Sequence, residues 1–343
     1  MLRINAGASS QKLQKALALL IALAFLAAVV SPSDAAQKII ITVPAMEAEQ
    51  GSFFIALKKG YFAAEGLDVE LQEAGGGTAT PALLSGSIQG SASAASAISA
   101  ILRGAALRVV AVFQDTLPYD IWAQPDIRTL ADLKGKAVGV ATRGDTFEIA
   151  TRLVLQGAGI SPDSVGYTPI GFGSTAGAAL ETGALPAVVL SHSQGLFMRD
   201  KGQLKNAHVL TALMGKVRMP YAGFVMSEKT LYGDPALAKR ILRAIVKGIR
   251  YEKAFKQPTI DILQSYQKDI NTRATLISYD DFTRTSTRDL TAGSDLITAD
   301  LAVRAHLLNI PDDKLPPVEK IYDFALVRAI NAELDASRWK PTR

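Results

Sequence analysis

The chain has 343 residues, of which 48% are hydrophobic and 20% charged, and its formal net charge is +5. This balance is close to that of an average globular protein and far from that of a disordered one, and the length suggests about two domains. The sequence contains no cysteine. This excludes disulfides, thiolate catalysis, Cys-ligated zinc, iron–sulfur clusters and any lipid attached through cysteine.

Residues 1–35 have the pattern of a secretory leader. Three basic residues precede an apolar run over residues 16–30, and Ser33 and Ala35 supply the small residues of a cleavage site after Ala35. The run is shorter than the roughly 20 residues that span a bilayer, and an uncleaved anchor is the alternative. We therefore expect a cleaved signal peptide and a periplasmic protein. Loss of the leader lowers the net charge from +5 to +3, a weak field that does not favour nucleic acid as a partner.

After the leader, short apolar strands alternate with helical segments, which is typical of an α/β fold with mostly parallel strands. Thr80 and Pro81 are expected as the N-cap and first residue of a helix. The other predicted elements of this first series are strands at 38–43, 67–71, 88–91 and 107–113 and helices at 52–59 and 96–103.

A second series begins at Thr129, which we expect to cap a short helix together with Asp132. The predicted elements that follow are strands at 137–141, 164–170 and 187–190 and helices at 145–156, 174–182 and 193–201. Residues 114–125 and 218–225 contain proline and tyrosine in extended-looking sequence, and we interpret them as two crossovers. Residues 36–120 with 222–343 then form lobe 1, and residues 121–221 form lobe 2.

The C-terminal part is predicted to be helical and to pack on lobe 1. Asp234 and Pro235 begin a long helix with an apolar stripe. Its opposite side has a basic stripe, which consists of Arg240, Arg243, Lys247, Arg250 and Lys253. This stripe is either a docking surface for a membrane protein or anionic lipid, or a solvated face.

The motifs of common enzymes are absent from the sequence. There is no HExxH, GxSxG or P-loop, and the three histidines are too scattered for a metal site or a triad. Residues 171–176 fit GxGxxA, but the acid that a dinucleotide site needs about 20 residues later is missing. We therefore predict no catalytic residue, no metal and no cofactor.

Loops rich in Gly, Ser and Thr recur between a strand and a helix N-terminus. They lie at 75–80, 91–96, 142–146, 173–175 and 191–193. In a parallel sheet such loops lie beyond the carboxyl ends of the strands, where their N–H groups and helix dipoles suit carboxylate, sulfonate or phosphate oxygens. The alternative for each loop is an ordinary N-cap. Tyr119 and Trp122 either stack on an aromatic ligand or pack in the core.

Several stretches resemble the SsuA/NMT1/THI5-like substrate-binding proteins, over about residues 38–230. They are FIALKKGYF at 54–62, EGLDVEL at 65–71, GGG at 75–77 and LADLKGKAVGV at 130–140. The resemblance implies a type II periplasmic binding protein fold, in which two βα lobes joined by two crossover segments surround a cleft, here with extra C-terminal helices. It also implies a monomer that closes on a small-molecule ligand and delivers it to an ABC permease and its ATPase.

The resemblance places the ligand contacts residue by residue. They are Met46, Glu47, Gly77, Thr78, Ser93, Gln114, Asp115, Arg143, Gly144, Asp145, Thr146, Ser174 and Ser191. Members of the family take up sulfonates, taurine, nitrate, pyrimidines or aromatic acids. Gln89 stands where many relatives have an acid. Because three of the thirteen contacts are carboxylates that would repel a purely anionic ligand, we expect a ligand with both an acid and a donor group.

Two alternatives on the same fold belong to other classes. One is the pyrimidine-synthesising enzyme of the THI5-like branch, which depends on a Cys-rich motif that this chain lacks. The other is a ligand-sensing regulator, which would need a DNA-binding helix-turn-helix where the leader stands.

Overall fold

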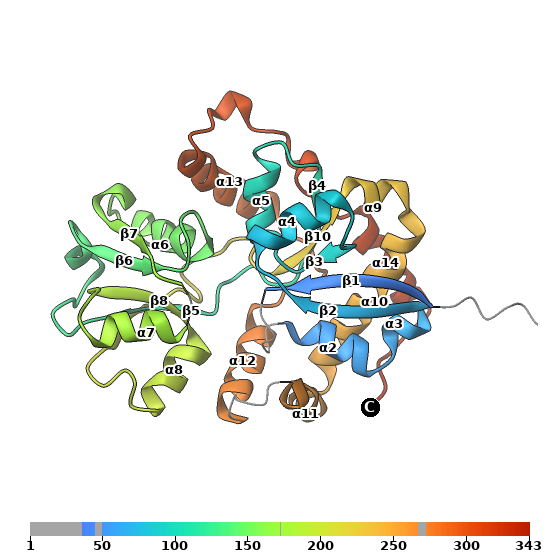
Figure 1. Cartoon of the computed structure of the whole chain (residues 1–343), viewed down its shortest axis with the longest axis horizontal. Coiled ribbons are helices and arrows are strands. Elements are labelled where there is room, and N and C mark those ends of the chain that lie inside the picture. Colours follow the sequence, from blue (N-terminus) through green and yellow to red (C-terminus); the bar gives the residue numbers. More distant parts are fainter. Residues whose placement is uncertain (1–35, 45–49, 172, 267–271) are drawn as a thin grey trace, which may run out of the picture. The chain divides into compact units, whose positions relative to one another are not determined.

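The computed structural model describes residues 36–44, 50–171, 173–266 and 272–343. The predicted leader lies outside these residues. None of the helices in the described ranges is long and apolar enough to cross a membrane. Residues Lys38–Arg343 form one unit, which is built on two five-stranded sheets (Figure 1).

The first sheet has the strand order β2-β1-β3-β10-β4. Its strands are β1 (Gln37–Val43), β2 (Leu67–Glu73), β3 (Gly90–Ser91), β4 (Leu107–Val112) and β10 (Gly223–Ser227). The helices along this part of the chain are α2 (Gly51–Lys58), α3 (Tyr61–Ala64), α4 (Gly76–Ser85) and α5 (Ala94–Ile101). β1 pairs with β3 in parallel, whereas β10 returns from the second sheet and inserts antiparallel between β3 and β4.

The second sheet has the strand order β7-β6-β8-β5-β9. Its strands are β5 (Tyr119–Ala123), β6 (Ala137–Val140), β7 (Gly166–Pro169), β8 (Ala187–Ser191) and β9 (His208–Ala212). Its helices are α6 (Thr146–Gly157), α7 (Ser174–Glu181) and α8 (His192–Asp200), with 3-10 turns at η2 (Leu130–Leu133) and η3 (Pro162–Ser164). β6 is parallel to β7 and β8, and β5 is antiparallel to β8 and β9.

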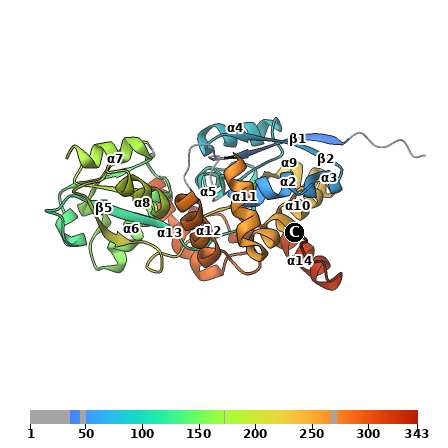
Figure 2. The same ribbon diagram turned by 90° about the horizontal axis from the view of Figure 1, so that it is seen from below.

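The C-terminal part is helical, as predicted. It comprises α9 (Glu228–Gly233), α10 (Pro235–Ala254), α11 (Lys256–Tyr266), α12 (Thr272–Thr285), α13 (Ser294–Leu308) and α14 (Ala325–Ala336), with 3-10 turns at η4 (Asp312–Lys314) and η5 (Val318–Lys320). α10 packs on α2 and α14, α12 contacts α8, and α13 contacts α6 (Figures 1 and 2). α12 and α13 therefore connect the C-terminal part to the second sheet.

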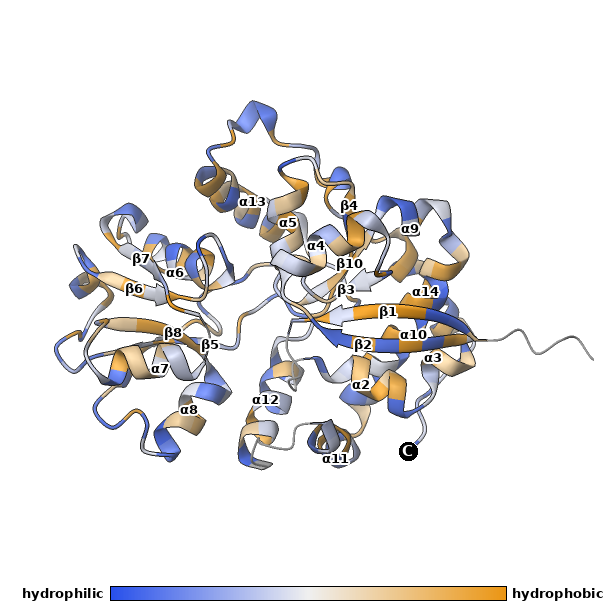
Figure 3. Ribbon diagram, viewed as in Figure 1, coloured by the Kyte–Doolittle hydropathy of each residue, from blue (hydrophilic) through white to orange (hydrophobic). Residues whose placement is uncertain are grey.

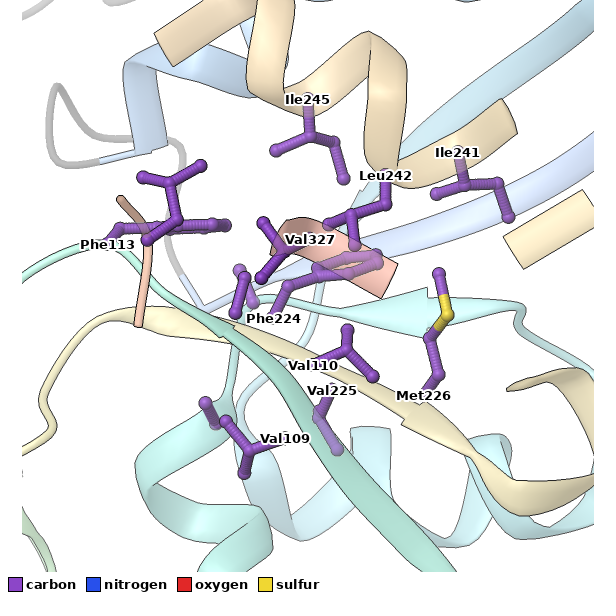
Figure 4. Packing of buried hydrophobic residues seen from close by; sticks show 14 of the residues in the cluster. Val109, Val110, Phe113, Phe224, Val225, Met226, Ile241, Leu242, Ile245 and Val327 are labelled. Atoms are coloured by element: carbon purple, nitrogen blue, oxygen red, sulfur yellow. The ribbon is translucent and has the colours of Figure 1, made fainter. Parts of the chain in front are cut away.

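The core of the first sheet lies between its strands and α10. Ile241, Leu242 and Ile245 of α10 lie over Phe224 and Val110 of the sheet (Figure 4). Each such side chain contributes about 1.5–3 kcal/mol when it is fully buried. Most of β1 is hydrophobic as well (Figure 3), as expected for a strand that is buried along most of its length.

Most predicted elements are present within a few residues of their predicted bounds, but the start of α4 was wrong. The helix begins at Gly76, with Gly75 as N-cap, and Pro81 lies inside it. A Cβ at Gly76 would lie 2.1 Å from the Cβ of Ser96, so the missing side chain lets the helix start against α5. A proline in the second turn removes one intrahelical hydrogen bond, and the helix continues through it.

The two predicted crossovers also contain strands that the sequence did not reveal. β5 occupies residues 119–123 and is buried at all five positions, so it lacks the alternation of a half-buried strand. β10 starts at Gly223. The connections between the sheets are correspondingly short, and Thr116 of one bridges Arg218 of the other. The two connections therefore run side by side.

The side chains of the basic stripe on α10 are paired with groups of the same chain. Arg243 and Lys247 form ion pairs with Glu65, and Arg243 also pairs with Glu333. The remaining members contact backbone or side chains of the same chain, at Glu65, Asn331, Asp335 and Thr287. The stripe therefore fastens α10 to α14 and to the turn before β2.

Candidate ligand-binding site

Three aromatic side chains meet where the connections join the two sheets. The Tyr119 and Tyr221 hydroxyls hydrogen-bond to each other, and their ring centroids are 5.3 Å apart. Phe147, in the first turn of α6, packs edge-on against Tyr119 with a centroid distance of 4.6 Å. The Tyr221 N–H donates to the backbone oxygen of Gln114 at 2.9 Å. We call Tyr119, Phe147, Tyr221 and Gln114, together with Ser93, the junction.

Gln114 presents an unpartnered acceptor at the junction. Its Nε2 donates to Thr285 Oγ1 at 2.6 Å, and the Thr285 hydroxyl donates to the Asp281 backbone oxygen at 2.7 Å. Because the single proton of Thr285 is used there, Thr285 must accept from Gln114, which fixes the orientation of the amide. Gln114 is fully buried, and its Oε1 has no hydrogen-bond partner among the described residues. A ligand that donates a hydrogen bond would satisfy it.

Ser93 provides a second unpartnered group from the first sheet. It is the N-cap residue of α5, and it bridges Gly223 at the start of β10. The Ser93 N–H donates to Ser91 Oγ at 3.1 Å. Its own hydroxyl is buried and has no partner within the described part of the chain. The hydroxyl can therefore donate to, or accept from, a ligand without breaking an existing bond.

Ser191 and Ser174 lie at helix N-termini of the second sheet. Ser191 is the register partner of Tyr119 in the β5–β8 pair, and its Oγ accepts from the Gln194 N–H at 3.3 Å as an N-cap. Ser174 is exposed at the start of α7. The preceding residue, Gly173, has a φ of +66°, and a Cβ there would lie 2.7 Å from Gln194 Nε2. Gln194 therefore links the starts of α7 and α8, with Ser191 directly beside the junction.

The loop before α6 is organised by its own carboxylates. Asp145 accepts from the N–H groups of Thr142 at 2.7 Å and Glu148 at 2.9 Å, and burial raises the pKa of Asp145. Gly144, whose φ of +72° favours glycine, donates its N–H to Glu148 Oε2 at 2.8 Å. Two N–H groups of the loop and one of the first turn of α6 are thus occupied. Thr146 is half-buried next to Phe147, and its hydroxyl has no hydrogen bond to the described residues.

Arg143 and Gly144 line a cavity that the other predicted contacts do not line. The cavity has a volume of about 160 Å³, and residues of α5 and α13 also line it. Arg143 Nη1 also donates to the Tyr167 backbone oxygen at 2.9 Å. Of the predicted loop residues, Arg143 and Gly144 therefore line this cavity, whereas Thr146 lies next to Phe147 of the junction.

The remaining predicted contacts differ in their surroundings. Gly77 and Thr78 are exposed in the first turn of α4, which packs on the first turn of α5 through the Gly76–Ser96 contact. Asp115 forms an ion pair with Arg218, so its charge is compensated within the chain. Met46 and Glu47 lie outside the described residues.

Sequence reasoning missed three members of the site, namely Phe147, Tyr221 and Thr285. The tyrosine in the return connection was the signal for Tyr221, but nothing in the sequence placed it against Tyr119. Thr285 belongs to a helix 171 positions away from Gln114, and such a pairing has no local pattern. No group of three or more His, Asp or Glu side chains that could hold a metal occurs in the described ranges.

Comparisons with known proteins place the chain in a recognised group. A family model described as NMT1/THI5 like matches residues 48–259. The riboflavin-binding protein RibY of Chloroflexus aurantiacus is 25% identical over 209 residues, which are 57% of this chain and 57% of RibY. This chain thus matches little more than half of the length of that relative.

Solved structures show the same fold at low sequence identity. The periplasmic aliphatic sulphonate binding protein SsuA from Escherichia coli superposes with a TM-score of 0.67 at 16% identity, over 83% of this chain and 97% of SsuA. The desulfurization enzyme DSZB has a TM-score of 0.60 at 12% identity, over 87% of this chain and 99% of that chain. The chain therefore has the periplasmic binding protein fold, which was expected, and the fold carries both binding proteins and an enzyme.

Proposed function

The chain belongs to the NMT1/THI5-like family, and from this premise we propose that it is the substrate-binding component of an ABC-type importer. In this role it binds a small organic molecule outside the cytoplasm, without transforming it, and delivers the ligand to a membrane permease driven by an ATPase. The RibY and SsuA resemblances support a binding role. Export by a cleaved leader and a monomeric state are parts of the same proposal.

The junction carries the proposal. Gln114 Oε1 and Ser93 Oγ are buried and lack partners among the described residues, and leaving such groups unsatisfied costs about 1–3 kcal/mol each. The chain links both residues to the ring cluster, since the Tyr221 N–H donates to the Gln114 backbone oxygen and Ser93 bridges Gly223, two residues after Tyr221. This combination suits a ligand that has a hydrogen-bond donor and a flat or apolar face. An acid group on the same ligand would lie at the N-termini of α5, α6 or α8.

We propose that lobe 1 (residues 36–120 and 222–343) and lobe 2 (residues 121–221) move about the two short connections. Thr116 and Arg218 pair across these connections, and β5 begins two residues before the proposed boundary. A ligand held by groups from both lobes stabilises the closed form, since it binds that form better. The proposed lobe boundaries lie close to the ends of the two sheets, so the short connections between the sheets can act as a hinge.

A thermal-shift screen tests this function. The panel consists of ethanesulfonate, taurine, nitrate, benzoate, thymine and riboflavin, and a ligand of the native state raises the melting temperature. We expect at least one member to do so. We also expect the change Ser93→Ala to weaken its binding while leaving the melting temperature of the free protein unchanged, with Ser161→Ala, an exposed site just before η3, as the control. Recovery of the ligand in a chemically altered form would show an enzyme instead, and equal affinities of the two variants would remove Ser93 from the site.

A further inference from the structure

The cavity of about 160 Å³ next to α13 is lined by three guanidinium groups. Arg103 comes from the turn after α5, Arg143 from the loop before α6, and Arg304 from α13. Leu307 and Leu308 of α13 complete the lining with apolar surface. Positive charge from three separate segments thus converges on one small space.

Arg304 is held rigidly at this cavity. It is 1% exposed, and its Nε donates to Asp300 Oδ2 at 2.8 Å. Its Nη1 donates to the Ala95 backbone oxygen at 2.7 Å and to Ser99 Oγ at 3.2 Å. Its Nη2 is buried without a partner among the described residues. Because Ser99 only accepts in its bond to Arg304, the hydroxyl proton of Ser99 is left to donate elsewhere.

Two of the three guanidinium groups have a carboxylate neighbour, and for Arg304 it is Asp300 at 2.8 Å. Glu148 lines it, but this fully buried carboxylate is already paired with Arg152 at 3.0 Å and accepts from the Gly144 N–H. Arg103 has no ion pair in the described ranges. Arg143 is 3.6 Å from the same Glu148 carboxylate, and its side chain is 57% exposed. Arg103 is therefore the guanidinium group of the cavity that lacks a carboxylate partner in the described ranges.

We propose that this cavity is a second binding site, for a small inorganic oxyanion of the sulfate or phosphate type. Guanidinium groups bind such oxygens through paired, charge-assisted hydrogen bonds, and the Ser99 hydroxyl supplies a further donor. A volume of about 160 Å³ is below the 300–1,000 Å³ typical of sites for larger organic ligands. A bound anion would pair with Arg103 and accept from Arg304 Nη2, which is buried without a partner among the described residues.

The position of the cavity gives the bound anion a structural consequence. Ile297 and Leu301 of α13 pack in the core of the first sheet, whereas Val303 and Leu307 pack against the core of the second. The anion would contact α5, α13 and the loop before α6 at once. It would therefore fasten the two halves of the molecule together on the α13 side.

This site is separate from the junction. Ser99 lies six residues beyond Ser93 along α5, and at 1.5 Å per residue this is about 9 Å of helix. The oxyanion site therefore goes beyond the proposed transport function, and it can exist whether or not the junction binds a transported ligand.

Calorimetric titration with sodium sulfate and with sodium phosphate, at constant ionic strength set with sodium chloride, tests the site. We expect saturable binding of one anion per chain. The variants Arg103→Gln and Ser99→Ala should each weaken it by about fivefold or more, since each loses one hydrogen-bond donor to the anion. The matched control is Arg128→Gln, because Arg128 is an exposed arginine in the loop after β5 and outside the cavity. No saturable binding, or equal affinities in Arg103→Gln and Arg128→Gln, would overturn the proposal.

A second comparison separates this site from the junction. The change Ser93→Ala should leave sulfate affinity unchanged. If Ser93→Ala weakens sulfate binding and Arg103→Gln does not, the anion occupies the junction, and the cavity is not an oxyanion site. The proposed transport function would survive that result, and a failed ligand screen would not affect the sulfate titration.

Discussion

The hydroxyl groups of Tyr119 and Tyr221 hydrogen-bond to each other although the two residues are 102 positions apart in the chain. Tyr119 is the first residue of β5, and Tyr221 lies in the connection that returns to β10. The pair therefore ties the start of the second sheet to the chain that leaves it. Because Phe147, in the first turn of α6, packs on Tyr119, a shift of α6 would displace this tyrosine pair.

The change Tyr221→Phe tests the contribution of the pair. It keeps the ring and removes one hydroxyl, so we expect a loss of about 0.5–1.5 kcal/mol in the free energy of unfolding, measured by urea denaturation. The control is Tyr232→Phe, in which an exposed bond from Tyr232 to Asp323 is lost, and its effect should be smaller. Losses of equal size would mean that the junction pair adds no more than a surface hydrogen bond.

The contact between α10 and α2 depends on a missing side chain. A Cβ at Gly248 would lie 2.2 Å from the backbone oxygen of Ser52, so Gly248→Ala forces the two helices apart. We expect a loss of about 1–3 kcal/mol in the free energy of unfolding. Gly157, the last residue of α6, has open space at its Cβ, and Gly157→Ala should instead stabilise by about 0.4–1 kcal/mol. Chemical denaturation of both variants measures whether each change lowers or raises the free energy of unfolding. An unchanged free energy of unfolding in Gly248→Ala would contradict the close approach of α10 and α2.

Glu252 predicts a pH dependence of stability. The carboxyl group is fully buried in α10, neither oxygen has a partner among the described residues, and burial raises its pKa well above the usual range. A raised pKa in the folded state means that the folded protein binds the proton more tightly than the unfolded chain does. The contribution of this group is therefore fully present below about pH 4.5 and is lost as the pH rises through the folded pKa.

The change Glu252→Gln keeps the shape and removes this titration. Relative to the wild type, the variant should gain stability steadily as the pH rises from 5 to 8, as measured by urea denaturation at each pH. Glu319→Gln, at an exposed position, is the control and should follow the wild-type curve. A constant difference between Glu252→Gln and the wild type across this range would show that Glu252 does not titrate abnormally.

Much of the fold could be predicted because its signals are local. The strand at Leu107–Val112 is a continuous apolar run, and Asp234 accepts from the Leu237 N–H at 2.9 Å as the N-cap of α10, as its position before Pro235 indicated. The interpretation of Asp132 as a capping-box acid is confirmed as well, since it accepts from the Thr129 N–H at 2.9 Å.

The features that could not be predicted depend on distant partners. β5 has no alternation because both of its faces are covered by the rest of the chain, and the basic stripe on α10 could be interpreted only with its acidic partners Glu65 and Glu333 in place. The same holds for the site. Ser93 and Gln114 were predicted from the resemblance, but that their polar atoms are unpartnered follows only from the packing around them.

The last prediction concerns Thr146, the first residue of α6. Its hydroxyl has no hydrogen bond to the described residues, and it precedes Phe147, whose ring packs on Tyr119 at the junction. Thr146→Val keeps the shape of the side chain and deletes the hydroxyl, so the N-cap Asp145 and the helix are unaffected. If the hydroxyl contacts the ligand, the panel member that gives the largest thermal shift should bind about 1–3 kcal/mol more weakly, because one polar group of the complex loses its partner. The free energy of unfolding without ligand should stay within about 0.5 kcal/mol of the wild type. Thr182→Val serves as the matched control, since the Thr182 hydroxyl is exposed and donates to the Ala178 backbone oxygen within α7. Calorimetric titration of both variants gives the comparison, and wild-type affinity of Thr146→Val would place α6 outside the ligand contacts and restrict the site to Ser93, Gln114 and the aromatic rings.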